Sequence, residues 1–319
     1  RLGVILLQGR RAAVQDQFHD SLELSGGEAF FTKLQNILVA GSQQLQNRER
    51  ETSHVETKIG IETEQTIAVL SLMQGLFLGQ HLRLQNLLRG KNPSKINLLR
   101  LSISPLAGLV SSVSSSTTHG GGLQIAEGVQ KGFEMLAESM SGANLASQHE
   151  LANNGFLDLA DRVYSTLQLE PKDSSAWLDA SVQAWYKRRS RRVDAAPDEL
   201  ESHDEHMDMS GSQQANILRS NIKQAVTRSL LVFLEGMQSR QALIRQICVK
   251  MQWRPIMKQL DKAYDSIGRE SCIPTALVTK EGIGYYILLK SFEMFDTDAE
   301  QIKRLLSKSN RQTAVKYFE

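Results

Sequence analysis

Three short clusters of residues have compositions that suit phosphate or metal chemistry. The first, Gly120 to Gly122, lies directly before a predicted helix, and backbone N–H groups at a helix N-terminus can bind phosphate. It lacks the lysine of a P-loop and a preceding strand, so we interpret it as a turn between helices. The second, His203 to His206, offers imidazole and carboxylate ligands for a divalent ion. Its spacing matches no established zinc pattern, and we interpret it as a solvated charge run.

The third cluster is the basic run Lys187 to Arg192. Such a run is typical of a localisation signal or of a contact with acidic lipids. Acidic residues follow it directly and compensate its charge: Asp194, Asp198, Glu199, Glu201, Asp204, Glu205 and Asp208. We therefore interpret this run as solvated surface.

The chain carries no motif of nucleophilic or metal-assisted hydrolysis. G-x-S-x-G, C-x-x-C and H-E-x-x-H are all absent, and these motifs mark hydrolases, thiol enzymes and zinc peptidases. Catalytic groups can also converge from distant parts of a chain, which leaves a helical hydrolase as a remote alternative. We predict that the protein is not an enzyme. Two cysteines, Cys248 and Cys272, imply no disulfide framework and fit a reducing compartment.

Composition places the chain among ordinary globular proteins. It has 319 residues, 41% hydrophobic and 23% charged, close to the usual proportions. The net charge of +2 argues against a general attraction to nucleic acid or anionic membranes. No stretch reaches the ~20 apolar residues of a membrane span, because Arg100 and Pro105 interrupt Leu98 to Val113. The chain starts with Arg1 and shows no signal-peptide pattern, so we expect a fragment of a longer protein.

Helical periodicity dominates the elements that must position any site. We expect helices over residues 29–39, 64–89, 123–140, 150–167, 174–189, 214–236, 240–251 and 255–267, with two more at the end of the chain. Pro93 is expected in the first turn of a further helix. Residues 43–58 are expected to form a solvated helix or a linker, 111–122 a loop, and 268–284 an irregular segment. The charged residues 191–213 are expected to form a mobile insertion.

About ten helices without strands predict an all-α fold. No repeat of fixed period is visible in the sequence. We therefore expect a helical bundle or, as the preferred fold, a degenerate armadillo-like helical solenoid.

Several motifs stand in an order that resembles one known family. The main ones are Leu84 to Arg89, Asn92 to Leu99, Ser116 to Gly121, and Phe133 to Glu138 with Gly142. This order resembles the RIH-associated helical region of the inositol trisphosphate receptor and ryanodine receptor family of calcium-release channels. Weaker matches extend over nearly the whole chain: Leu6 to Gly9, Val14 to Phe18, Glu28 to Phe31, Ser229 to Glu235, Leu260 to Tyr264, Gly284 to Leu288 and Tyr317 to Glu319. The later segments resemble the receptor type more than the ryanodine type.

The resemblance implies a division of the chain and a role for it. Residues 1–60 would end a preceding helical region, 61–267 would form the RIH-associated domain, and 268–319 would lead toward a membrane domain. The implied role is a cytosolic coupling segment of a ligand-gated calcium-release channel at the endoplasmic reticulum or another internal membrane. Its implied partners are the other domains of a homotetrameric channel, with no nucleic acid and no membrane contact by this segment.

The resemblance also implies a calcium-sensing site, with calcium as a regulator and no resident cofactor. In the family, two glutamates of this region join a contact from a C-terminal segment. Glu138 falls on the second glutamate, whereas Leu78 falls on the first. Calcium takes six to eight oxygen ligands, so Leu78 predicts a weakened or lost site, with Gln74 or Gln80 as a neutral substitute. The alternative for Glu138 is an exposed helix carboxylate.

Glu235 also matches a family glutamate, and we assign it to packing or second-shell support. The alternative to the channel hypothesis is a cytosolic helical-repeat scaffold that binds protein partners.

Overall fold

The computed structural model describes residues 12–24, 27–50, 60–115, 122–142, 144–166, 211–236, 247–266, 275–295 and 299–307. Within these ranges every regular element is a helix and no strand occurs, which confirms the all-α fold class. The predictions for residues 174–189, for the basic run, for His203 to His206, for Gly120 and Gly121, and for Cys272 lie outside the described residues.

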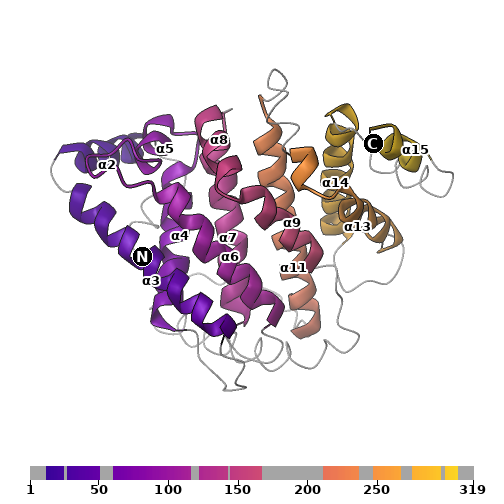
Figure 1. The fold of residues 1–319 in the computed structure, drawn as a ribbon, viewed down its shortest axis with the longest axis horizontal. Helices are drawn as coiled ribbons and strands as arrows, with labels where there is room; N and C mark the ends of the chain where they lie inside the picture. The colour runs from indigo at the N-terminus through magenta and orange to yellow at the C-terminus, as the bar shows by residue number, and fades with distance from the viewer. Residues whose placement is uncertain are drawn as a thin grey trace, which may run out of the picture.

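The helices lie side by side, roughly in chain order, from α2 and α3 at one end of the molecule to α14 and α15 at the other (Figure 1). Their bounds are α2 Ala12–Leu24, α3 Gly27–Arg50, α4 Ile61–Phe77, α5 Leu82–Leu88, α6 Leu98–Ser115, α7 Gly122–Met140, α8 Leu145–Asn153, α9 Phe156–Thr166, α11 Gly211–Leu234, α13 Trp253–Ser266, α14 Thr275–Phe295 and α15 Ala299–Leu306.

Helix α7 is the centre of this arrangement, because α4, α6, α8 and α11 all pack against it. Its last two turns are buried on every side, from Met135 to Met140, as expected for a helix enclosed by others. Gly128 and Gly132 let neighbouring helices approach α7 closely. A Cβ on Gly128 would lie 2.7 Å from Cγ1 of Ile67 on α4, and one on Gly132 would overlap the side chain of Leu106 on α6.

The single helix predicted over residues 64–89 is wrong, because the chain breaks between α4 and α5. Gly79 and Gln80 have φ values of 76° and 62°, in the left-handed region that ends helices and favours glycine. His81 then starts α5, since its Nδ1 accepts a hydrogen bond from the backbone N–H of Leu84 at 3.2 Å. Apolar residues lie on both sides of the break, up to Leu78 and from Leu82, which is why hydrophobicity alone did not locate it.

A second break divides the predicted helix 150–167 into α8 and α9. Gly155, between them, has a φ of 89°, and Asn154 ends α8 with its backbone N–H bonded to the carbonyl of Leu151. The two short helices can therefore take different directions along the edge of α7 and α11.

The expected helix start at Pro93 is also wrong. Asn92 is buried and closes a turn, because its Nδ2 donates to the carbonyls of Leu87 and Ile96. Helix α6 begins only at Leu98, where the side chain of Asn97 accepts from the N–H of Arg100 at 2.9 Å. An asparagine side chain is among the best N-terminal caps, so the cap, not the proline, sets this boundary.

Helix α3 continues to Arg50, which agrees with the helix alternative for the first part of residues 43–58. Two other boundaries differ from the expectation: α6 extends to Ser115 within the predicted loop, and α14 begins at Thr275 within the predicted irregular segment. None of the helices in the described ranges combines the length and the hydropathy that a membrane crossing requires.

Candidate functional site

The C-terminal end of α7 contacts the motif Leu84 to Arg89, which lies on α5 and at its C-terminal end. Gln85 on α5 is buried, and its Nε2 donates to the carbonyl of Glu138 at 2.8 Å and to that of Ser141 at 3.4 Å. Its Oε1 accepts from Nδ2 of Asn144 at 2.8 Å. These bonds satisfy carbonyls that the end of a helix leaves free. The fold therefore joins two of the motifs, Leu84 to Arg89 and Phe133 to Glu138.

Glu138 itself is buried, with 5% of its surface exposed, and is not the exposed carboxylate of the alternative. Its Oε1 accepts from Nη2 of Arg228 on α11 at 2.6 Å. The arginine side chain is 53% exposed, so the pair joins an interior carboxylate to a cation at the surface. A carboxylate removed from water needs such a partner. Arg228 thus holds the position that a bound cation would take next to this oxygen.

Leu78 lies at the C-terminal end of α4, and its hydrocarbon side chain offers no ligand. Its backbone carbonyl accepts from Nε2 of Gln15 on α2 at 2.7 Å. The loop after it does reach the end of α7, because Gln80 lies beside Gly142. Position 78 therefore supplies no second carboxylate to a site at Glu138.

Gln74, one of the two suggested substitutes, contacts a different carboxylate on α7. Its Nε2 donates to Oε2 of Glu134 at 2.7 Å, and Gln130 and Lys131 donate to the same carboxylate. Burial alone would raise the pKa of Glu134, but the hydrogen bond from Gln130, the charge of Lys131 and the other donors lower it overall. Glu134 is thus an ionised carboxylate one turn before Glu138.

Glu235 follows the end of α11, and its side chain is exposed. Its backbone carbonyl, rather than its carboxylate, makes the packing contact, because it accepts from Nε2 of Gln148 on α8 at 2.9 Å. The same Nε2 donates to the carbonyl of Val232 at 3.1 Å. This buried amide joins the start of α8 to the end of α11.

Sequence analysis did not identify Arg228, Gln85 or Glu134 as parts of this site. Arg228 lies off the apolar face of the helix predicted over 214–236 and is exposed, so its sequence position gives no signal of a buried partner. The partner lies 90 residues earlier, and no sequence spacing could have named it.

A second buried polar group joins α11, α13 and α14, and we call it the α11–α14 cluster: Ser220, Lys223, Gln259, Glu281 and Tyr285. Glu281 is buried and accepts from the hydroxyls of Ser220 and Tyr285. Lys223 Nζ lies 3.0 Å from Oε1 of Gln259 and 3.5 Å from Oε1 of Glu281. Lys223 of α11 therefore contacts both α13 and α14.

Tyr285 of this cluster and Tyr164 beside it are fully buried and lie edge to face, with ring centroids 6.1 Å apart. Burial raises the pKa of Tyr164, opposed by its hydrogen bond with Thr227. Burial and the negative charge of Glu281 raise the pKa of Tyr285 well above 10. Both phenols must stay protonated in the folded protein.

The raised pKa values predict a loss of stability in alkali. Above pH ~10 the unfolded chain releases these phenolic protons while the folded chain retains them, so the free energy of unfolding falls as pH rises, by about 1.4 kcal/mol per pH unit for each tyrosine. Tyr164→Phe should make this fall shallower by about that amount, measured by urea unfolding between pH 9.5 and 11.5. Equal slopes for the variant and the parent chain would contradict the prediction; between pH 6 and 9 the two slopes should agree.

The chain matches no protein-family model, and a search of curated proteins finds no significant match. A functional hypothesis for this chain therefore has two sources: the resemblance described above, and the geometry around Glu138 and the α11–α14 cluster.

Proposed function

We propose that this chain is a cytosolic coupling segment of a ligand-gated intracellular calcium-release channel. In this proposal it lies on the cytosolic face of the endoplasmic reticulum or another internal membrane, within a homotetramer assembled through other regions. Its helices form an armadillo-like array that transmits conformational change from ligand-binding domains to the pore. The ordered resemblance of motifs along the chain is the observation that carries the proposal.

The arrangement of the helices is suited to mechanical transmission. Helix α7 packs against α4, α6, α8 and α11, and α11 packs against α14 in turn. Packed helices with fixed contacts displace one another as rigid elements, which is how interfaces amplify small shifts. A displacement of α7 would reach α14 through two helix contacts, and a displacement of α4 through three.

Calcium would act at Glu138 in competition with Arg228. The carboxylate is buried and already paired at 2.6 Å, so a calcium ion has to displace the guanidinium before it can bind. Carboxylates supply most of the affinity of calcium sites, and Leu78 supplies none. The proposed sensor is therefore weak in this chain, and its occupancy is linked to the contact between α7 and α11.

The test is calcium release from endoplasmic-reticulum vesicles that carry the full-length gene product, with inositol trisphosphate added as the probe. We expect release, and we expect Arg228→Gln to lower the calcium concentration for half-maximal stimulation about tenfold, since about 1.4 kcal/mol of competition is removed. Glu138→Gln should abolish stimulation by calcium. The matched control is Glu127→Gln, an exposed carboxylate on the same helix.

If neither Glu138→Gln nor Arg228→Gln changes the calcium dependence of release, the calcium assignment is refuted and the coupling role remains. No release, with the product absent from the membrane fraction, would refute the channel proposal and favour the scaffold. One observation already favours that alternative: α14 exposes Ile283, Ile287 and Met294 at helical spacing, an apolar stripe of the kind that binds partner helices.

A further inference from the structure

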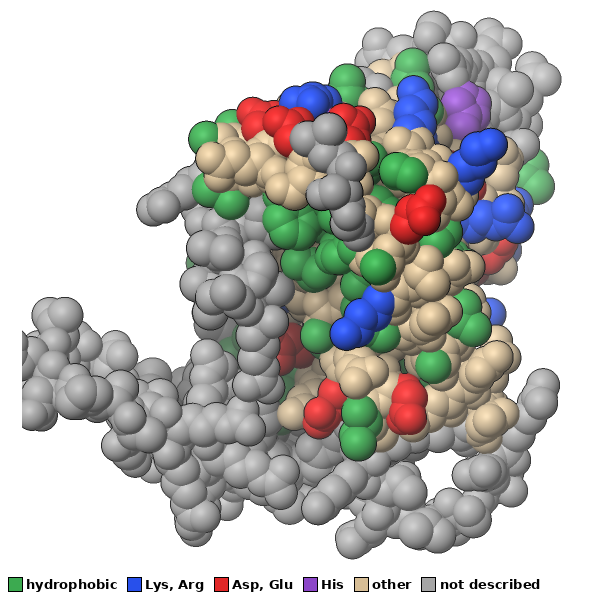
Figure 2. All heavy atoms as spheres, turned by 90° about the vertical axis from the view of Figure 1, so that its left-hand side faces the viewer, with side chains coloured by type: hydrophobic (Ala, Val, Ile, Leu, Met, Phe, Trp, Pro, Cys, Tyr) green, Lys and Arg blue, Asp and Glu red, His purple; other side chains and the backbone are tan. Residues whose placement is uncertain are grey.

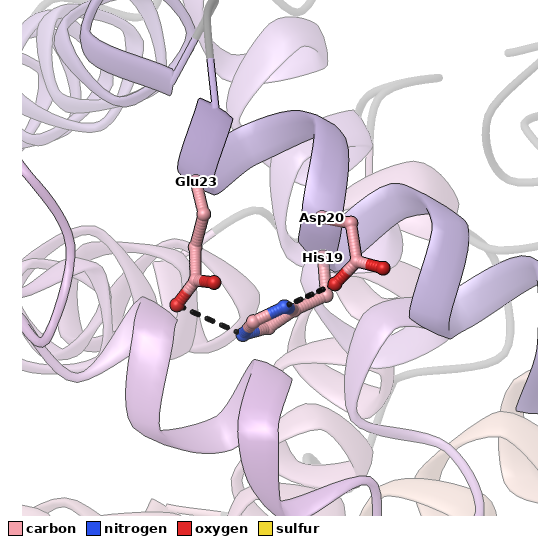
Figure 3. A group of neighbouring side chains, drawn as sticks. All are labelled: His19, Asp20 and Glu23. Carbon is pink, nitrogen blue, oxygen red and sulfur yellow. Dashed lines mark hydrogen bonds and ion pairs between the residues drawn. The ribbon is translucent and has the colours of Figure 1, made fainter.

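A separate group of metal-binding side chains lies on α2, within the end of the molecule formed by the N-terminal helices. His19, Asp20 and Glu23 place one ligand atom each within 4.8 Å of one another. His19 is buried, whereas the side chains of Asp20 and Glu23 are about half exposed, at 53% and 51%. The imidazole therefore lies in the protein with a carboxylate on either side of its ring (Figure 3).

Asp20 fixes the state of the imidazole. Nδ1 of His19 lies 3.2 Å from Oδ1 of Asp20, and Nη2 of Arg83 on α5 lies 2.9 Å from the same oxygen. Arg83 forms an ion pair with Asp20, whose carboxylate is ionised at neutral pH like that of an ordinary aspartate. An ionised carboxylate can only accept, so Nδ1 carries the hydrogen and donates it.

The other ring nitrogen then presents its lone pair to a second carboxylate. Nε2 of His19 lies 3.4 Å from Oε1 of Glu23, and two acceptors that face each other need a cation between them. A proton on Nε2 is one answer, but an N⁺–H···O⁻ bond is normally about 2.7–2.9 Å long. Two ligands on a tetrahedral zinc ion, each about 2.05 Å from the metal, lie about 3.3 Å apart. The observed separation of 3.4 Å between Nε2 of His19 and Oε1 of Glu23 agrees with the distance between two ligands of one zinc ion.

We propose that Nε2 of His19 and the carboxylate of Glu23 chelate a divalent transition-metal ion of the zinc class. Asp20 orients the imidazole through Nδ1–H, the arrangement in which a carboxylate supports a metal-bound histidine. Water completes the coordination on the exposed side. An imidazole ligand favours zinc over calcium, which takes oxygen ligands. This site is independent of the channel proposal, because it uses neither Glu138 nor its partners.

The surrounding charges set the sign of the expected effects. Acidic and basic side chains lie close together at the top of this end of the molecule (Figure 2). Arg83 contacts both Asp16 and Asp20, and its charge opposes a bound cation. His81 is not a ligand: its Nδ1 accepts from Leu84, so its Nε2 carries the hydrogen that faces Asp16.

The test is zinc titration calorimetry on the 319-residue chain with His203 and His206 changed to glutamine, since those histidines lie in another acidic run. Glu23→Gln should weaken zinc binding at least tenfold. Asp20→Asn should weaken it about tenfold, the usual effect of losing a carboxylate that supports a metal-bound histidine. Arg83→Gln should tighten it several-fold. The matched control is Asp16→Asn, which removes the same charge from the same helix without removing a proposed ligand.

Circular dichroism of each variant shows whether α2 and its neighbours remain folded. The cobalt complex provides a second readout, because the intensity of its visible absorbance reports protein-bound cobalt of low coordination number and should fall in Glu23→Gln together with zinc affinity. Equal weakening by Asp16→Asn and Glu23→Gln would overturn the proposal, since it would show general attraction to an acidic surface. Displacement of zinc by equimolar calcium, or no zinc binding by the parent chain, would overturn it as well.

Discussion

Replacing Lys223 by methionine is expected to lower the free energy of unfolding by about 3 kcal/mol, the usual cost of leaving one partner of a buried ion pair without its counter-charge. The lysine and Glu281 side chains are only 18% and 9% exposed. Without the ammonium, Glu281 keeps its hydroxyl donors but has no opposite charge, and Oε1 of Gln259 loses its donor. Nε2 of Gln259 is already buried without a hydrogen bond. Urea unfolding followed by circular dichroism measures the effect.

The chain offers a matched control for this substitution. Lys250 and Asp158 form a pair at 3.0 Å, but their side chains are 39% and 58% exposed. Lys250→Met should therefore change the free energy of unfolding by less than about 1 kcal/mol. The double variant Lys223→Met with Glu281→Gln should recover part of the loss, because the neutral amide still hydrogen-bonds with the hydroxyls of Ser220 and Tyr285 and leaves no buried charge unpaired. Equal effects of Lys223→Met and Lys250→Met would show that burial of the α11–α14 cluster does not determine its energy.

Phe233→Ala is expected to destabilise the protein by about 3–5 kcal/mol, the range for removing a buried aromatic ring from a packed core. Phe233 on α11 is fully buried, and its ring centroid lies 5.2 Å from that of Phe156 on α9. The cavity would open where α9 contacts α11, so we expect α9 to lose protection from hydrogen exchange before α4 does.

Leu82→Ala is the control for this second prediction, since Leu82 is among the exposed apolar residues. Its effect should stay within about 0.5 kcal/mol. A loss for Phe233→Ala below about 1 kcal/mol would mean that the α9–α11 contact closes around the missing ring, a collapse that moderates the cost of cavities. Exchange measured by mass spectrometry separates the two outcomes.

Apolar residues at helical spacing predicted most of the helices in the described residues, but not α2. The face expected over residues 29–39 is an example: Phe31, Leu34 and Leu38 are buried in the core. Boundaries were less predictable. The break after α4 depends on two left-handed residues, Gly79 and Gln80, and the break after α8 on Gly155. The start of α6 depends on the cap at Asn97. Such local hydrogen bonds do not alter the apolar pattern.

The environment of the predicted residue Glu138 could not be predicted from the sequence, and the cluster on α2 was not predicted at all. Glu138 was identified from its motif, but its pairing with Arg228 is a tertiary contact between α7 and α11. The histidine cluster on α2 escaped notice for another reason. His19 and Glu23 are one helical turn apart, a spacing too common to indicate a metal, and only the burial of the ring and its two carboxylates make it distinctive.

The glycines of α7 have a consequence for how this gene can change over time. Any single-base change in the codon of Gly128 or Gly132 that alters the amino acid introduces at least a Cβ, and each position already touches Ile67 or Leu106 where that atom would be. A substitution at either residue therefore requires the facing side chain to shift or to become smaller. Substitutions where α7 packs against α4 and α6 should therefore occur in pairs. The two glycines should be retained longer in evolution than the surface residues of the same helix.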